Sequence, residues 1–379
     1  MKRYNNYSTS NLMDTPTATP DKLATQIQSY IDKREVYKAD NPKARARGVA
    51  EAIGLSEAEF VALDLGHRSN EDRVVRLAEA WTDILAEIES LGEVMALTRN
   101  EACVHEKVGT YKNFEVHQGA PIALFVDEKI DLRIFLSHWA HGFAVSAPNA
   151  MNGKTMHSLQ FFNKAGEAVH KIYMREGSNM EAFEALLEKF RAEEQVPLLF
   201  DARPEQAPSV LTTEKPDSEI DVDGFLAEWR ALQDTHDFFG MTKKYGVTRT
   251  QALRLAEGEF TRKVSVGSAR DLLEKAASSG TPLMVFVGNK GCIQIHSGEV
   301  VKLMERGPWY NVMDPGFNLH LNEEHITDAW VVRKPSEDGD VNALEVYDAQ
   351  GEQIVQFFGK RKPGIPELES WREIAASLS

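Results

Sequence analysis

Hydrophobic side chains recur with two different periods along this chain, and each period predicts a different kind of element. A spacing of three or four residues, which places side chains on one face of a helix, joins Phe225, Trp229, Leu232, His236 and Phe239. Apolar and polar residues instead alternate, as half-buried strands require, over 93–98, 102–107, 156–162, 168–174, 283–287, 292–296, 343–347 and 353–358. Helices and antiparallel strand pairs are both predicted, and the fold class is therefore α+β.

Helices are expected ahead of the strands in each half of the chain. Residues 21–95 look mainly helical, and Ser56 stands where it can cap a helix. In the later half, Thr248-Arg249-Thr250-Gln251 fits a capping box, which predicts a second helix starting at Thr248. Each half therefore offers helices that can cover one face of an antiparallel sheet.

The order of elements occurs twice, because short motifs recur in both halves. Asn100-Glu101-Ala102-Cys103-Val104 corresponds to Asn289-Lys290-Gly291-Cys292-Ile293, and Asp131-Leu132-Arg133 corresponds to Asn318-Leu319-His320. The offset between corresponding residues drifts only from 189 to 185 along the chain. Self-similarity of this length indicates an internal duplication, in which each half is a large antiparallel β-sheet flanked by α-helices. Two copies also allow one site to keep a function that its twin has lost.

Composition divides the chain into four segments. Residues 1–20 are polar and rich in Ser, Thr and Asn, which predicts a disordered tail. The first repeat covers 21–200 and the second covers 221–379. Between them, 201–220 holds three prolines among polar residues, which is typical of a linker.

The overall charge and the absent motifs exclude several classes of protein. The 379 residues carry a net charge of −15, so neither nucleic acid nor an anionic membrane is an expected partner. No run of about 18 apolar residues and no apolar signal core occurs, and we expect a cytoplasmic protein without membrane insertion. The two cysteines, Cys103 and Cys292, are expected to be buried free thiols. Motifs for nucleotide hydrolysis, zinc proteolysis, serine hydrolysis and dinucleotide binding are absent.

Two interpretations of His236 are open. As a histidine on the apolar face of a helix, followed by Phe238 and Phe239, it can be a core residue whose ring nitrogens bond to the backbone. It can also be an axial iron ligand, because a neutral imidazole on an aromatic-walled face suits a flat apolar cofactor.

Basic residues near this histidine also allow two interpretations. In the alternating segment 130–136, Arg133 points away from the core that holds Leu132 and Ile134. It lies either towards a cleft or on the surface, paired with Asp131 or Asp127. Arg249, Lys334 and Arg361 are each ordinary solvated charges if taken singly. Together they place cations on the same repeat as His236, in an otherwise acidic chain.

Seven segments in order resemble signatures of the haemin-degrading factors, cytoplasmic haem proteins of bacterial haem uptake. Among them are the motifs Asn100-Glu101-Ala102-Cys103-Val104-His105-Glu106-Lys107-Val108-Gly109, Ile130-Asp131-Leu132-Arg133, Ser158-Leu159-Gln160-Phe161-Phe162 and Asp234-Thr235-His236-Asp237-Phe238-Phe239-Gly240. The others are Met284-Val285-Phe286-Val287-Gly288-Asn289, Trp330-Val331-Val332-Arg333-Lys334-Pro335 and Phe358-Gly359-Lys360-Arg361. The resemblance runs from about residue 40 to the C-terminus and includes the duplication.

The resemblance implies a haem site in the second half, with help from the first. His236 is implied as the iron ligand, and Arg133 as the residue approaching the opposite haem face. Arg249, Lys334 and Arg361 fall where relatives contact the haem propionates, and Phe286 and Gln356 fall near the haem. This chain departs from some relatives at Phe358, where they have tyrosine, so a hydrogen bond from that position is absent.

The resemblance leaves two functions open. The first is oxidative haem degradation that releases iron with electrons from an external donor. The second is a haem storage and trafficking protein, supplied by a haem importer and delivering to a separate haem oxygenase. A duplicated scaffold that binds no haem is the third interpretation, in which the motifs are remnants of the fold.

Overall fold

The computed structural model describes residues 20–67, 69, 72–117, 119–149, 153–195, 199, 214–362 and 364–379. The predicted tail, apart from Pro20, and the linker up to residue 213 lie outside these residues. Helices of the first half are α1 (Pro20–Asp40), α2 (Ala46–Ile53), α3 (Glu57–Ala62), α4 (Trp81–Glu87) and α5 (Met180–Phe190). Those of the second half are α6 (Val222–Arg230), α7 (Asp237–Tyr245), α8 (Arg249–Leu255), α9 (Ser268–Ser279) and α10 (Glu369–Ser377).

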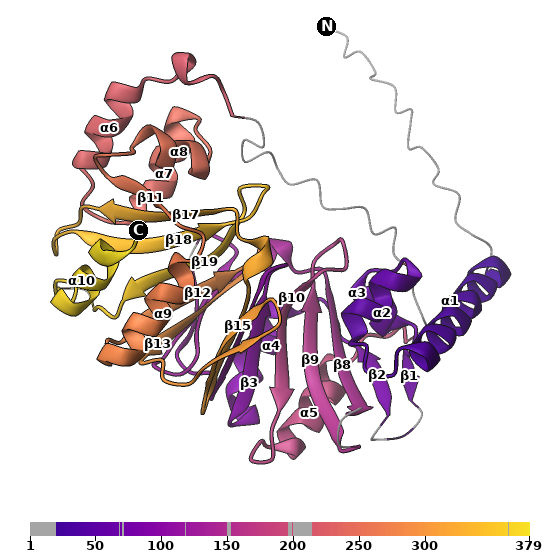
Figure 1. Ribbon diagram of the computed structural model, residues 1–379. Coiled ribbons are helices and arrows are strands. Elements are labelled where there is room, and N and C mark those ends of the chain that lie inside the picture. The colour runs from indigo at the N-terminus through magenta and orange to yellow at the C-terminus, as the bar shows by residue number, and fades with distance from the viewer. Residues whose placement is uncertain are drawn as a thin grey trace, which may run out of the picture.

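Two large sheets carry these helices, and every pairing of neighbouring strands within them is antiparallel (Figure 1). The ten-stranded sheet runs β1 (Gly66–His67), β2 (Arg73–Arg76), β8 (His141–Pro148), β9 (Thr155–Phe162), β10 (Ala168–Met174), β3 (Val94–Arg99), β4 (Cys103–Gly109), β16 (Phe317–Asn322), β15 (Trp309–Asp314), β14 (Leu303–Arg306). The nine-stranded sheet runs β11 (Thr261–Val264), β17 (Asp328–Lys334), β18 (Val341–Tyr347), β19 (Gln353–Gly359), β12 (Leu283–Gly288), β13 (Cys292–Gly298), β7 (Asp131–Phe135), β6 (Ile122–Val126), β5 (Phe114–Val116). The predicted α+β class with two antiparallel halves is confirmed.

The two halves exchange strands, which the sequence did not predict. Strands β14, β15 and β16 of the second half extend the first-half sheet beyond β4, and β5, β6 and β7 of the first half extend the second-half sheet beyond β13. The register at the two junctions is equivalent, because Ile293 lies opposite Arg133 as Val104 lies opposite His320. Each sheet is therefore completed by three strands of the other half.

The second-half sheet buries its two faces differently. On one face, Leu272, Leu273 and Trp371 of α9 and α10 pack against Val285 and Phe357. On the other face, α6, α7 and α8 cover only the end near β17 and β18, through residues such as Phe225, Trp229, Phe238 and Trp330 (Figure 1). The middle strands of that second face are left for a site.

Several local predictions need correction. The helix predicted over 225–239 is two helices, α6 and α7, because the Asp234 side chain accepts the backbone N–H of His236 at 2.9 Å and forms a turn there. The predicted helical segment 21–95 also contains strands β1 and β2. By contrast, Ser56 caps α3 in a complete capping box, as expected.

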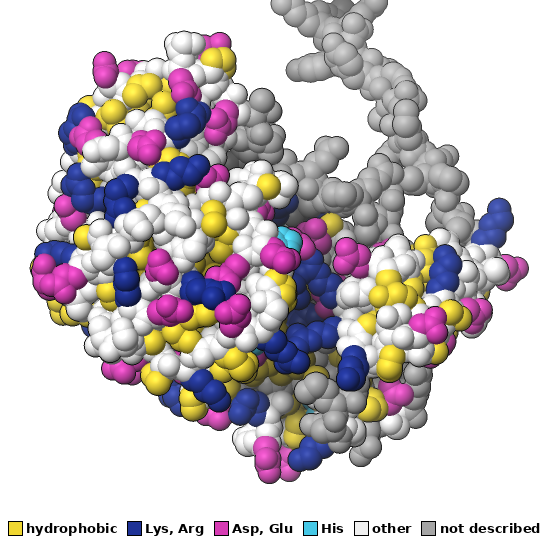
Figure 2. All heavy atoms as spheres, viewed as in Figure 1, with side chains coloured by type: hydrophobic (Ala, Val, Ile, Leu, Met, Phe, Trp, Pro, Cys, Tyr) yellow, Lys and Arg dark blue, Asp and Glu magenta, His cyan; other side chains and the backbone are white. Residues whose placement is uncertain are grey.

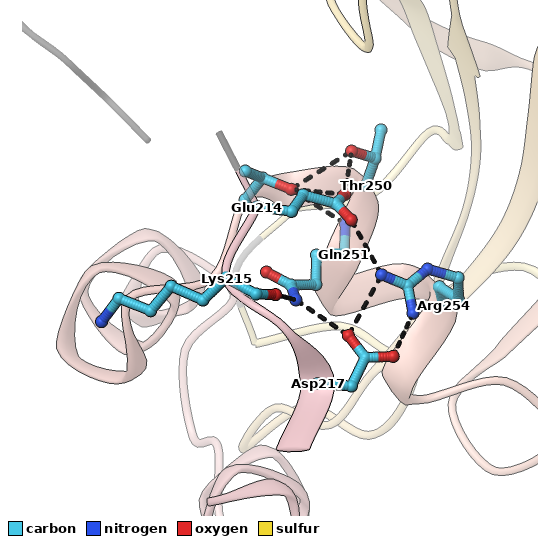
Figure 3. Close-up of polar contacts among 7 residues, drawn as sticks. Glu214, Lys215, Asp217, Thr250, Gln251 and Arg254 are labelled. Atoms are coloured by element: carbon cyan, nitrogen blue, oxygen red, sulfur yellow. Dashed lines mark hydrogen bonds and ion pairs between the residues drawn. The ribbon is translucent and has the colours of Figure 1, made fainter. Parts of the chain in front are cut away.

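The start of α8 is tied to the described end of the predicted linker (Figure 3). Thr248 caps this helix by accepting the backbone N–H of Gln251 at 3.0 Å. The Gln251 amide does not complete a capping box; it donates instead to Lys215 O at 2.7 Å and to Asp217 at 2.9 Å. Asp217 also pairs with Arg254. These contacts fix the end of the helix from which Arg249 projects.

Two further expectations can be compared with the structure. Cys103 and Cys292 are buried free thiols, as predicted, and burial raises the pKa of Cys292 to about 12. Of the helices in the described ranges, none combines the length and apolarity that spanning a bilayer requires.

Candidate functional site

A continuous row of side chains crosses the open face of the second-half sheet. Residues directly opposite one another on paired strands project from the same face. The row is Trp330 (β17), Glu345 (β18), Gln356 (β19), Phe286 (β12), Ile295 (β13) and Asp131 (β7). Two predicted site residues, Phe286 and Gln356, are therefore direct cross-strand neighbours.

The alternation of β7 places Arg133 on this same face. Leu132 and Ile134 are fully buried on the other side, as the sequence predicted, while the Arg133 side chain is half-exposed. Its guanidinium donates to the Asp131 carboxylate and to Leu132 O at 3.2 Å. Arg133 reaches the second-half sheet only because β7 has been exchanged.

Glu345 lies at the centre of a buried polar cluster. The carboxylate is 0% exposed and accepts from Arg249 Nε at 2.9 Å, Lys334 Nζ at 3.1 Å and Gln356 Nε2 at 2.8 Å. The Tyr347 hydroxyl also donates to it. Two cations and one carboxylate thus leave one positive charge in excess.

Burial and neighbouring charges set the pKa values in this cluster. Burial alone would raise the pKa of Glu345, but Arg249 and Lys334 outweigh it and hold that pKa far below its usual range. Burial lowers the pKa of Lys334 to about 8, against the opposing effect of Glu345. The cluster is therefore charged at neutral pH, with Lys334 close to its titration range.

His236 is placed differently from the sequence-based interpretation of a histidine on an apolar helix face. It precedes the first turn of α7, and its side chain is 91% exposed. The ring nitrogen Nδ1 lies 2.6 Å from Asp234 Oδ1. The other ring nitrogen, Nε2, makes no hydrogen bond to the described residues and is available to a ligand. A carboxylate on one ring nitrogen fixes the tautomer of a metal-binding imidazole. An imidazole that is paired with a carboxylate through one nitrogen fits a metal ligand. The exposure of the His236 side chain excludes the interpretation of a buried core histidine.

Phe238 connects the helix that carries His236 to the cation cluster. Its buried ring centroid lies 4.4 Å from Lys334 Nζ and 5.1 Å from the Arg249 guanidinium. Cations over an aromatic face are attracted by its quadrupole. The position of α7 is thereby coupled to the position of both basic side chains.

Arg361 and Phe358 complete the predicted set. Arg361 pairs with Asp338 at 3.3 Å. The pKa of Asp234 is lowered mainly by the hydrogen bond from the His236 backbone, and the charge of Arg361 lowers it further. Phe358 packs edge-on against Phe286, with ring centroids 5.1 Å apart. Apolar walls therefore lie between the cations and Arg133.

A cavity of about 750 Å³ lies between the two halves and adjoins this face. Phe286, Ile293 and Gln356 line it from the second half, and Arg47 and Arg99 line it from the first. Lys and Arg side chains gather in the hollow between the halves (Figure 2). Of the predicted site residues, Phe286 and Gln356 line the cavity. The cavity wall does not include His236, Arg133, Arg249, Lys334 or Arg361.

The equivalent face in the first half has lost the cation cluster. The equivalent row there is Phe143, Gln160, Lys171, Leu97, Glu106 and Asn318. Gln160 occupies the place of Glu345, and Lys171 pairs with Glu57 at the first position of α3, where α8 has Arg249. The charges of Arg99, two residues beyond Leu97 on β3, and of Arg47 also act on Glu57. This face therefore keeps basic residues but has no buried carboxylate at the position of Glu345. This difference assigns the candidate site to the second half.

Four contributors were missed from the sequence: Glu345, Tyr347, Asp234 and Phe238. Glu345 and Tyr347 lie in the repeated strand motif, but alternation alone marks them as ordinary outward-facing positions. Asp234 stands two residues before His236, which was a usable signal for a carboxylate partner. Phe238 was identified as an aromatic neighbour, without its contact to the cations.

Comparisons with known proteins agree on one family. A family model of the haemin-degrading HemS.ChuX domain matches residues 54–190 and 246–378, once in each half. The hemin transport protein HmuS of Yersinia pestis is 37% identical, and the alignment covers 94% of this chain and 97% of HmuS. The hemin transport protein HemS of Yersinia enterocolitica is 39% identical, and the alignment covers 90% of this chain and 95% of HemS.

Solved structures of full-length relatives have the same fold. Holo-PhuS, a heme-binding protein from Pseudomonas aeruginosa, superposes with a TM-score of 0.86 at 44% identity, covering 94% of this chain and 99% of PhuS. The heme degrading enzyme ChuS of Escherichia coli O157:H7 gives 0.82 at 35% identity, covering 93% of this chain and 99% of ChuS. The chain belongs to the haemin-degrading HemS.ChuX family.

Proposed function

We propose that this chain binds haem on the open face of the second-half sheet, in the cytoplasm, as part of bacterial iron acquisition. The observation that carries the proposal is His236, an exposed imidazole whose Nδ1 is held by Asp234, while Nε2 has no hydrogen bond to the part of the chain that the structure describes. Relatives that are 35% to 44% identical over nearly their whole length are a heme-binding protein and a heme degrading enzyme. The donor set therefore fits haem iron, which takes one neutral imidazole.

Each part of the site has a role in this proposal. His236 binds the iron through Nε2, and Asp234 keeps the tautomer that frees this nitrogen. Phe286, Phe358 and Ile295 provide an apolar wall for the macrocycle. Arg249 and Lys334 receive one propionate, and Arg361 the other, through charge-assisted hydrogen bonds. Arg133 donates hydrogen bonds towards the face of the haem opposite His236.

The activity that we propose is oxidative haem degradation that releases iron. Haem supplies the redox chemistry when bound, and this chain supplies binding, orientation and hydrogen bonds. Nη1 of Arg133 is engaged by Asp131 and Leu132 O, so Nε and Nη2 are the donors that remain for the haem among the contacts of the described residues. Electrons come from an external donor.

The alternative is a carrier that receives haem from an importer and delivers it to a separate haem oxygenase. The pairing of Arg133 with Asp131 favours this function, because Nη1, which Asp131 and Leu132 O engage, is not offered to the haem. The sequence also lacks a recognisable flavin or nicotinamide motif. Both functions require the same binding site.

Haemin titration followed by absorbance tests the site. The wild-type chain should give a Soret band and a histidine-ligated ferric spectrum, and His236→Ala should lose or rearrange that spectrum. His325→Ala is the matched control, because His325 is also exposed but lies on η4 (Glu323–His325), next to β16 of the first-half sheet. An unchanged spectrum and affinity in His236→Ala would exclude this residue as the ligand.

A second experiment separates the enzyme from the carrier. Haem-loaded protein is given ascorbate under air with catalase present, and the Soret band is followed. Loss of the band under these conditions supports degradation by the protein. If loss requires free peroxide and catalase prevents it, the carrier is the function.

A further inference from the structure

We propose that Glu345 is a positioning residue that holds Arg249 and Lys334 together as a receptor for a single propionate carboxylate. This inference rests on the proposed haem-binding function and adds a residue to it. Glu345 is fully buried and lies beneath both basic side chains, so it cannot itself receive the ligand. Its role is to fix where their remaining donors point.

The hydrogen-bond pattern shows which donors remain. Arg249 uses Nε and Nη2 on Glu345 and Tyr347, and among the described residues its Nη1 has no partner. Lys334 gives one of its three N–H groups to Glu345 and makes no other hydrogen bond within the described part of the chain. The Arg249 side chain is 33% exposed, whereas Lys334 is only 6% exposed. A carboxylate approaching over Arg249 therefore meets Nη1 first and Lys334 behind it.

The charge balance limits the cluster to one carboxylate. Arg249 and Lys334 carry two positive charges and Glu345 one negative charge, while Tyr347 and Gln356 are neutral. One incoming carboxylate neutralises the excess, and a second would be an uncompensated buried charge, which is costly. The other propionate must therefore be received elsewhere, and Arg361 is the remaining one of the three predicted propionate contacts.

Glu345 also keeps Lys334 charged. Burial lowers the pKa of Lys334, Arg249 lowers it further, and only Glu345 raises it. Phe238 of α7 and Gln356 of β19 face the ammonium without a titrating charge, and Tyr347 beside it has a strongly raised pKa. Removing the Glu345 charge should therefore deprotonate Lys334 near neutral pH and lose one of the two cations.

The experiment compares haemin with haemin dimethyl ester in wild type and Glu345→Gln. The two probes share iron, macrocycle and the His236 bond, so the ratio of their affinities isolates the propionate contribution. Wild type should prefer haemin by about tenfold or more at pH 7, and this preference should fall as pH rises through about 8. In Glu345→Gln the preference for haemin over its dimethyl ester should fall at lower pH than in wild type, so that much of this preference is already absent at pH 7. The wavelength of the Soret band should be unchanged.

Matched variants separate positioning from stability. Glu367→Gln changes another buried glutamate, which bonds to Asn342 on the covered face of the same sheet, and should keep the wild-type ratio and pH profile. Glu345→Asp should restore part of the ratio. If Glu345→Gln does not fold, Lys334→Met serves instead, because it should lose the same pH-dependent part of the preference.

The outcomes distinguish this inference from the proposed function. A wild-type chain without a histidine-ligated spectrum refutes the proposed function itself. A wild-type chain that binds haemin normally, with a Glu345→Gln variant that keeps the same ratio and the same pH profile, refutes only the role of Glu345. The same conclusion follows if Lys334→Met retains the pH-dependent preference.

Discussion

Replacing Asn289 by alanine should destabilise the whole protein, because this side chain joins the two halves. Its amide donates to Arg99 O and Val169 O of the first half, both at 2.9 Å, and accepts from the backbone N–H groups of Gly291 and Cys292, both at 3.0 Å. Each bond contributes about 1 kcal/mol net, which sums to about 4 kcal/mol. Asn289 lines the cavity, where water can replace some of these bonds, so we expect about 3 kcal/mol.

Asn289→Asp sharpens the test, since it keeps the two accepted bonds and places a carboxylate against two carbonyl oxygens. Its loss should at least equal that of the alanine variant. Asn100 makes the equivalent contacts to Gly288 O and Ile354 O, so Asn100→Ala should cost a similar amount. Asn318→Ala is the control, because within the described ranges that side chain makes a single hydrogen bond, to Glu106.

The assay is equilibrium unfolding in guanidinium chloride, followed by far-ultraviolet circular dichroism and tryptophan fluorescence. The shared sheets predict one coincident transition in the wild-type chain. A loss below about 1 kcal/mol in Asn289→Ala, no larger than that of Asn318→Ala, would refute the reasoning that these bonds hold the halves together.

Three further outcomes are expected. Arg133→Ala should slow haem turnover, followed by Soret decay, more than it weakens haemin binding; equal effects would contradict its role opposite the iron ligand. Gly291→Ala should lower the unfolding free energy by about 1–3 kcal/mol, because a Cβ there would lie 2.5 Å from Val169 Cγ1, whereas Gly267→Ala, with its nearest atom at 3.6 Å, should be tolerated. Burial lowers the pKa of Lys107 from 10.5 to about 8, so between these pH values the unfolded chain binds more protons and the unfolding free energy should rise with pH. Lys107→Met should reduce this rise, measured by unfolding at several pH values. An unchanged dependence of the unfolding free energy on pH would exclude Lys107 as the cause of the rise.

The fold class could be predicted, and a duplication inferred, because both leave local signals in the sequence. Alternation marks each strand, and the paired motifs around Asn100 and Asn289 mark the repeat. The exchange of strands leaves no such signal. Nothing local in β7 distinguishes pairing with β13 from pairing within its own half, since both neighbours need the same alternation.

The candidate site was predicted as a set of residues but not as an environment. The 3.6-residue spacing that joined His236 to Phe225 passed through an Asp-Thr turn, where side-chain bonds to the backbone compete with the helix. Periodicity therefore assigned His236 to a buried face, whereas the structure exposes it. The Glu345 cluster was missed for the opposite reason, because a charged residue in an alternating strand is normally exposed, and only its cations make burial tolerable.

The exchange of strands explains how two halves with similar strand pairing can carry two unequal faces. Because β7 crosses into the second-half sheet and β16 into the first, each face is built from both repeats, and a substitution in one repeat alters the site of the other. Arg133 therefore belongs to the face that carries Glu345, while its counterpart His320 belongs to the face that carries Gln160. The first face has Gln160 at the position of Glu345, and its carboxylate, Glu57, is paired with Lys171 and also feels the charges of Arg99 and Arg47. A buried carboxylate that holds two cations side by side therefore occurs on the face with Glu345 and not at the equivalent position of the other face, although both faces have the same strand pairing.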